Sequence, residues 1–171
     1  MRFFTHDWST LDDVETDKIS SEHLRVVKLA SDQCGIPLVK FVREFDLRGA
    51  LVDRLLVQSG EAELKLDLIA GDNLHGYFVL SLAYASSSFR YFGEDLGTAL
   101  DFRSTRIRFV EFDLGNNGEL QHRFLLWPKS RCEIDIQFAG LEWAKAHLPH
   151  RAYQNLEDVL QLSEPLSTAT E

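Results

Sequence analysis

The sequence predicts a soluble α+β protein built on an antiparallel β-meander of about six strands, with an N-terminal helix and short C-terminal helices. Three observations lead to this prediction. Apolar residues recur at helical spacing near the N-terminus, a two-residue alternation begins at Ala50, and turn-forming residues separate the alternating runs. The 171 residues fit a single domain, which we place at 1–162 and follow with a frayed tail at 163–171.

The N-terminal helix is expected to begin at Ser20 or Ser21, either of which can cap it, and to end before Gly35. Residues 38–48 fit either a short helix or a strand. The helix would bury one apolar face, which comprises Leu24, Val27 and Ala30.

Six alternating runs predict the strands, at residues 50–57, 61–69, 77–84, 104–114, 119–127 and 131–138. One long connection, 85–103, divides them into two groups of three. Beyond the last strand, two short amphipathic segments are expected to be helices, at 141–148 and 152–162.

Strand register follows from residue parity, because a shift by one residue would move every apolar side chain to the opposite face. Loops at 116–118 and 128–130 keep the apolar sets together. This register pairs Arg123 with both Glu111 and Asp135 and places the three in one outward row.

Two irregularities are also expected. A β-bulge near 109–110 would account for the switch of the apolar residues from odd to even positions. The facing of strand 50–57 stays open, because either Asp53 or Arg54 must point toward its buried side.

The row of Glu111, Arg123 and Asp135 is the best-defined polar feature, and it has two interpretations. Two carboxylates that flank a guanidinium can bind a cationic group or orient a water molecule. Alternatively, the row is a set of cross-strand ion pairs that contribute about 0.2–1 kcal/mol each. We favour the second interpretation, because such pairs are common and weak on exposed sheets.

His122 is predicted to lie among apolar side chains, opposite Phe112 and near Ile136. A buried neutral histidine is the usual outcome at such a position. A catalytic histidine would need a carboxylate as its partner, and Asp53 is the only candidate that parity offers.

Three aromatic residues of the long connection, Phe89, Tyr91 and Phe92, also have two interpretations. They can form a partner-binding surface, or they can fold back over one end of the sheet. The second is favoured, since exposed aromatic clusters promote aggregation.

Composition excludes several classes of protein. The net charge of -9 disfavours a nucleic-acid partner, and the sequence contains no long apolar run for a membrane span and no signal-like N-terminus. The two cysteines, Cys34 and Cys132, lack the spacing of a metal site. We therefore expect a cytoplasmic protein with reduced thiols and without metal or cofactor.

The first eight residues, MRFFTHDW, resemble the opening M-K-Y-F-T-x-x-W of small uncharacterised bacterial proteins. The likeness continues through the order of the later elements, such as GYFVLSLAY and EIDIQF. Those proteins carry Leu-His-Asp near the third element, where this chain has Leu47-Arg48-Gly49. The resemblance implies no activity and no functional residue.

These observations favour a non-enzymatic interaction protein, for instance an acidic inhibitor that neutralises a basic protein partner. One alternative is a small hydrolase or isomerase that uses His122 with a carboxylate. Another is a protein that binds a small apolar ligand between the sheet and the 85–103 connection.

Overall fold

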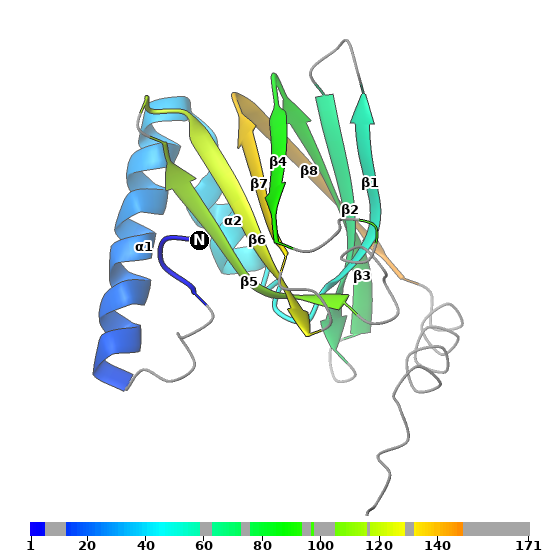
Figure 1. The fold of residues 1–171 in the computed structure, drawn as a ribbon, viewed down its shortest axis with the longest axis horizontal. Helices are drawn as coiled ribbons and strands as arrows, with labels where there is room; N and C mark the ends of the chain where they lie inside the picture. The colour runs from blue at the N-terminus through cyan, green and yellow to red at the C-terminus, as the bar shows by residue number, and fades with distance from the viewer. Residues whose placement is uncertain are drawn as a thin grey trace, which may run out of the picture.

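The computed structural model describes residues 1–5, 13–58, 63–72, 76–93, 97, 105–115, 117–128 and 132–148. Within these residues the chain forms two α-helices and eight antiparallel strands, as Figure 1 shows. In chain order they are α1 (Asp13–Cys34), α2 (Leu38–Glu44), β1 (Leu51–Gln58), β2 (Glu63–Asp72), β3 (Gly76–Ala85), β4 (Ser88–Phe92), β5 (Thr105–Leu114), β6 (Leu120–Pro128), β7 (Glu133–Phe138) and β8 (Gly140–His147).

The predicted α+β class is confirmed, but the strands form two sheets and not one meander of about six. Sheet A has the order β1-β2-β3-β8 and sheet B the order β4-β7-β6-β5. The pairing of β3 with β8 continues into that of β4 with β7, since Ala85 faces Gly140 and Ser88 faces Gln137 in one register. The β3–β4 segment bends at Ser86 (φ 49°), and the β7–β8 segment bends at Ala139.

The sheets also meet at the opposite side of the molecule. The Gly49 N–H donates to the Ile107 carbonyl and the Ile107 N–H donates to the Ala50 carbonyl, both at 2.8 Å. Residues just before β1 therefore pair with the free edge of β5 at this single point.

Two predicted segments differ from the structure. The 85–103 connection contains β4, and residues 141–148, which we expected to be a helix, form β8. Amphipathic spacing cannot distinguish these states in so short a run, and the open edge of β3 offers eight aligned partners to β8. The predicted helix at 152–162 and the tail lie outside the described residues.

The two helices resolve other expectations. α1 begins at Asp13, earlier than the predicted serine caps, and it ends just before Gly35, which has a φ of 67°. The ambiguous segment 38–48 begins with a helix, α2, whose buried residues are Leu38 and Phe41.

The predicted registers of sheet B are confirmed. Glu111 faces Arg123, Arg123 faces Asp135, and the register shift in β5 falls between Ile107 and Phe109, close to the expected bulge. Gly118 has a φ of 80°, the left-handed conformation that its loop requires.

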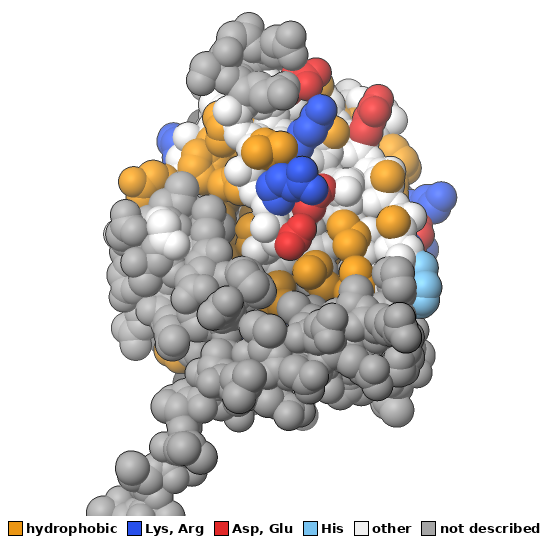
Figure 2. Space-filling view, turned by 90° about the vertical axis from the view of Figure 1, so that its right-hand side faces the viewer, with side chains coloured by type: hydrophobic (Ala, Val, Ile, Leu, Met, Phe, Trp, Pro, Cys, Tyr) orange, Lys and Arg blue, Asp and Glu red, His pale blue; other side chains and the backbone are white. Residues whose placement is uncertain are grey.

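A second shift, between Val52 and Arg54, decides the facing of β1. Val52 is opposite the buried Leu68, whereas Arg54 is opposite Asp67 on the outer face. Figure 2 shows that outer face of sheet A, where basic and acidic side chains lie next to one another among apolar ones.

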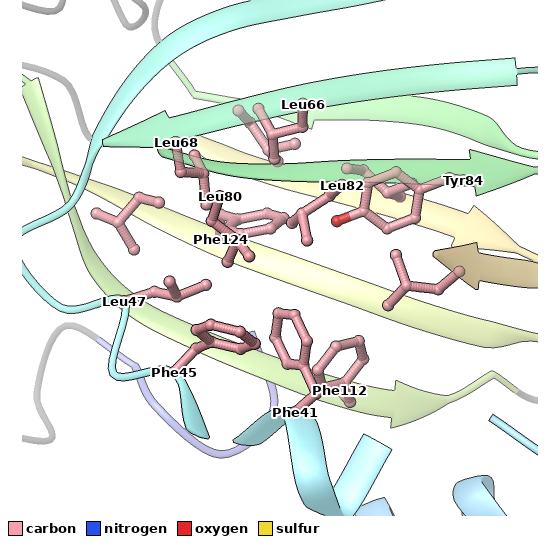
Figure 3. Close-up of a cluster of buried hydrophobic side chains, with 14 of the residues drawn as sticks. Phe41, Phe45, Leu47, Leu66, Leu68, Leu80, Leu82, Tyr84, Phe112 and Phe124 are labelled. Carbon is pink, nitrogen blue, oxygen red and sulfur yellow. The ribbon is translucent and has the colours of Figure 1, made fainter. Parts of the chain in front are cut away.

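The core lies between the sheets and is closed at one end by α2 and the turn that follows it (Figure 3). Each large side chain buried there stabilises the fold by about 1.5–3 kcal/mol. Sheet A contributes Leu66, Leu68, Leu80, Leu82 and Tyr84, sheet B contributes Phe112 and Phe124, and the helical layer contributes Phe41, Phe45 and Leu47.

The outer face of sheet B is covered. α1 packs along β5, and residues 1–5, here called the N-terminal segment, lie between α1 and the sheet (Figure 1). Neither of the described helices has the length and apolar character needed to cross a bilayer.

Candidate functional site

A pocket of about 340 Å³ lies beside the free edge of β5. We call it the β5 edge pocket. α1, the α2–β1 region, β5 and the N-terminal segment all contribute to its wall. The lining residues are Phe4, Ser20, His23, Phe41, Val42, Phe45, Asp46, Leu47, Arg48, Phe109, Val110 and Phe112.

The pocket occupies a gap in the hydrogen bonding along the β5 edge. At one end of the gap the Phe112 N–H donates to His23 Nε2 at 3.2 Å. At the other end, Ile107 is paired with Gly49 and Ala50. Val110 lies between these two points and lines the pocket.

The backbone N–H and C=O groups of Val110 point outward from the edge of the sheet. In antiparallel pairs, the N–H and C=O groups of alternate residues face the same side of the strand. The Phe112 N–H points away from β6 toward His23, so the Val110 N–H and C=O point away from β6 as well. Among the described residues no hydrogen bond reaches either group.

The His23 side chain lies in the pocket wall as a neutral ring, and its hydrogen bond from the Phe112 N–H fixes its orientation. It is only 5% exposed, and burial lowers its pKa below the ordinary value, although Glu111 and Asp113 oppose the shift. Because Nε2 accepts a backbone hydrogen bond, the proton of the neutral ring resides on Nδ1. Within the described part of the chain Nδ1 has no hydrogen-bond partner.

Aromatic rings form most of the remaining wall. The Phe4 ring contacts His23 edge-on, with centroids 4.9 Å apart, and stacks on Phe109 at 6.1 Å. On the inner side Phe41 meets Phe112 edge-to-face at 5.5 Å, and Figure 3 shows both rings beside Phe45. The N-terminal segment thus completes a pocket that α1 and β5 begin.

The rim carries a charged pair with no net charge. Arg48 donates to both carboxylate oxygens of Asp46, at 2.6 Å from Nη2 and 3.0 Å from Nε, and these bonds lower the pKa of Asp46. Both side chains stay more than half exposed. The pocket therefore combines an apolar interior with a neutralised rim.

The predicted charged row of Glu111, Arg123 and Asp135 is assembled as expected, but it is buried. Glu111 is 0% exposed and Asp135 4%, whereas the prediction placed the row on an outward, solvated face. The row does lie on the face of sheet B that points away from the core, but the N-terminal segment covers this face and shields the row from solvent. The estimate for exposed pairs therefore does not apply.

Glu111 holds the N-terminal segment in place. Its carboxylate accepts the backbone N–H groups of Arg2, Phe3 and Phe4, at 2.6, 2.8 and 3.2 Å. Its Oε1 also accepts a hydrogen bond from Arg123 Nη1 at 3.1 Å. One carboxylate thus joins two strands to a segment more than a hundred residues away in sequence.

Further charges extend the row in both directions. Arg2 Nη1 donates to Asp113 at 2.9 Å, Arg90 Nη2 donates to Asp135 at 2.8 Å, and the α-ammonium of Met1 pairs with Glu133. Arg123 bonds to Asp113 and Gln121 as well. Basic groups therefore already occupy the positions where the row was expected to bind a cation.

His122 and Asp53 are not brought together. His122 is fully buried, stacks on Phe112 with centroids 3.9 Å apart, and shares a hydrogen bond of 2.7 Å with the Tyr84 hydroxyl through Nδ1. Burial lowers its pKa well below the ordinary value. Asp53 is exposed at the bulge of β1. The two residues form no acid–base pair.

The three aromatic candidates of the 85–103 segment all lie within one edge strand, β4. Tyr91 and Phe92 are about half exposed, and Phe89 packs against the core and against Tyr91. β4 pairs with β7 on one side. None of the three lines the β5 edge pocket.

Metal chemistry has no assembled donor set in the part of the chain that the structure describes. No group of three histidine, cysteine or acidic side chains there is arranged to hold an ion. Cys34 is exposed and Cys132 is buried, and neither forms a disulfide.

Comparisons with protein-family models, with curated proteins and with solved structures gave no significant match.

Sequence reasoning missed the β5 edge pocket entirely. Its walls come from four segments that lie far apart in the sequence, and none of them carries a motif. One signal was available, because His23 lies on the same helical stripe as Val26 and Val27 and therefore had to face the sheet.

Proposed function

We propose that this protein binds, without transforming it, a small and largely apolar molecule in the β5 edge pocket. The single observation that carries the proposal is the gap in the edge of β5, which is lined by aromatic rings and closed at both ends. Sheet edges are normally paired, covered or protected by charge. This one instead faces a preformed cavity.

The size and chemistry of the pocket fit such a ligand. A volume of about 340 Å³ falls at the lower end of the range for small-molecule sites. Such sites typically combine apolar walls with a few polar groups that orient the ligand. Here those groups are the Val110 backbone, Ser20, His23 and the Asp46–Arg48 pair.

Binding of a neutral fluorophore, N-phenyl-1-naphthylamine, tests the proposal. We expect saturable binding at one site per chain, with enhanced fluorescence. Val42→Trp on α2 should fill the pocket and abolish binding. Lys40→Trp, on the exposed face of the same helix, is the matched control and should bind like the wild type. Absence of saturable binding to the wild type would refute the proposal.

A second candidate function is interaction with a basic protein, as an acidic cytoplasmic inhibitor would require. The observation that favours it is that carboxylates beside the charged row already bind basic groups: Asp113 binds Arg2, and Glu133 binds the α-ammonium of Met1. A basic segment of a partner would compete for the same carboxylates.

Capture experiments from the source cell at low and high salt test this second candidate. A partner held by the carboxylates should be recovered at low salt and lost at high salt. Asp113→Asn, which removes the charge that Arg2 binds, should weaken capture, and Asp67→Asn on sheet A should not. Recovery of no partner at either salt would count against it.

A further inference from the structure

We infer that the ligand of the β5 edge pocket carries a carboxamide or lactam group, which pairs with the backbone N–H and C=O of Val110. This inference rests on the proposed function and specifies the chemical class of its ligand.

Val110 presents one backbone donor and one backbone acceptor to the pocket. Its N–H and C=O lie side by side on the open edge of β5, because the register directs both away from β6. A carboxamide presents an oxygen and a neighbouring N–H on one edge. The two groups are therefore complementary, and they would form two hydrogen bonds.

The edge of β5 is too short here to accept an added β-strand. A strand that pairs with β5 would need the edge groups of residues on either side of Val110. The Phe112 N–H is already bound by His23, and Ile107 is bound by Gly49 and Ala50. Between Ile107 and Phe112, Val110 is the described residue whose outward N–H and C=O both lack a partner among the described residues, which suits a single functional group.

The rest of the pocket wall favours a ligand with an apolar body and no charge. Phe41, Phe45 and Phe109 offer faces and edges on which an aromatic or aliphatic body would pack. Asp46 and Arg48 neutralise one another at the rim, and His23 is neutral because burial lowers its pKa. None of the described residues that line the cavity carries an uncompensated charge, so a neutral ligand is favoured over an ion.

A series of three compounds of nearly equal shape tests the inference. 2-Naphthamide has both a C=O and an N–H, 2-acetonaphthone has only the C=O, and 2-isopropylnaphthalene has neither. Each is titrated against the complex of the full chain with N-phenyl-1-naphthylamine. After correction for transfer from water to octanol, 2-naphthamide should bind roughly tenfold more tightly than 2-isopropylnaphthalene, with 2-acetonaphthone between them.

A matched pair of variants isolates the backbone donor. Val110→Pro removes the N–H at an edge position, where proline is tolerated, and Val110→Ala trims the side chain but keeps the N–H. Relative to Val110→Ala, Val110→Pro should weaken 2-naphthamide and 2-acetonaphthone about fivefold and leave 2-isopropylnaphthalene unchanged.

The outcomes separate the inference from the proposed function. Equal corrected affinities of the three compounds for the wild type would overturn the inference, even if Val110→Pro failed to fold. Equal binding of 2-naphthamide by the two folded variants would overturn it as well. The proposed function would survive both results, since it fails only if the wild type does not bind N-phenyl-1-naphthylamine or if Val42→Trp binds it as the wild type does.

Discussion

The outer faces of the two sheets carry similar charge pairs in different surroundings. On sheet A, Arg54 and Asp67 are 3.1 Å apart, and the arginine side chain is 58% exposed. On sheet B, Arg123 and Glu111 are also 3.1 Å apart, but their side chains are 17% and 0% exposed. The pairs differ chiefly in what covers them, which is solvent on sheet A and the N-terminal segment on sheet B.

This difference changes what each pair contributes to stability. When an exposed pair forms, each charge exchanges favourable interactions with water for an interaction with its partner, so the net gain in stability is small. A buried pair contributes through the network that compensates its lost hydration, and loss of one member leaves the others uncompensated. We therefore expect loss of one member of the pair to cost little stability on sheet A and much more on sheet B.

Replacement of Glu111 should have the largest effect. Glu111→Ala leaves three backbone N–H groups and Arg123 without their acceptor, so we expect the free energy of unfolding to fall by about 3 kcal/mol or more. Urea denaturation measures the change. Glu111→Gln should lose less stability than Glu111→Ala, because the amide oxygen can still accept some of these hydrogen bonds. A decrease below about 1 kcal/mol would show that burial of the row is unimportant.

Acid should have the next largest effect on stability, through two buried histidines. The pKa values of His23 and His122 are both lowered in the folded protein, chiefly by burial, so the unfolded chain takes up protons first. Stability should be independent of these residues above about pH 6.5 and should fall as the pH decreases below it. Urea denaturation at several pH values measures this.

His122→Phe provides the control for the acid effect. It keeps an aromatic ring on Phe112 but removes the titrating group, so its stability should fall less steeply with acid than that of the wild type. An unchanged pH dependence in the variant would assign the acid sensitivity to other groups.

Loss of the Arg2 side chain should have an intermediate effect. The guanidinium is 53% exposed but pairs with the buried Asp113, so Arg2→Gln should lower stability by about 0.5–1.5 kcal/mol. Hydrogen exchange of the Phe3 and Phe4 amides should accelerate more than that of β2 amides. Equal acceleration everywhere would mean that the segment does not loosen separately.

The pair on sheet A should matter least. Asp67→Asn should change the free energy of unfolding by less than about 1 kcal/mol, and high salt should reduce even that difference. A loss as large as that of Glu111→Ala would remove the contrast between the two faces.

Much of sheet B could be predicted from residue parity. The alternation of Leu120, His122 and Phe124 with Gln121 and Arg123 allows one register that buries the apolar set, and the structure has it. The partition into two sheets could not be predicted, because the bends at Ser86 and Ala139 lie within otherwise continuous pairing. The strand at 141–148 could not be predicted either, because amphipathic spacing in so short a run fits a helix as well as a strand, and only the edge of β3 decides between them.

The sequence by itself determined the α+β class, the registers of β5, β6 and β7, and the alignment of Glu111, Arg123 and Asp135. These depend on alternation and turn chemistry, which act between residues close in the chain. Only the tertiary structure decided that the charged row is buried and that a pocket opens at Val110. Both depend on which distant segment covers a sheet face or edge, and the residues of that face do not encode what covers it.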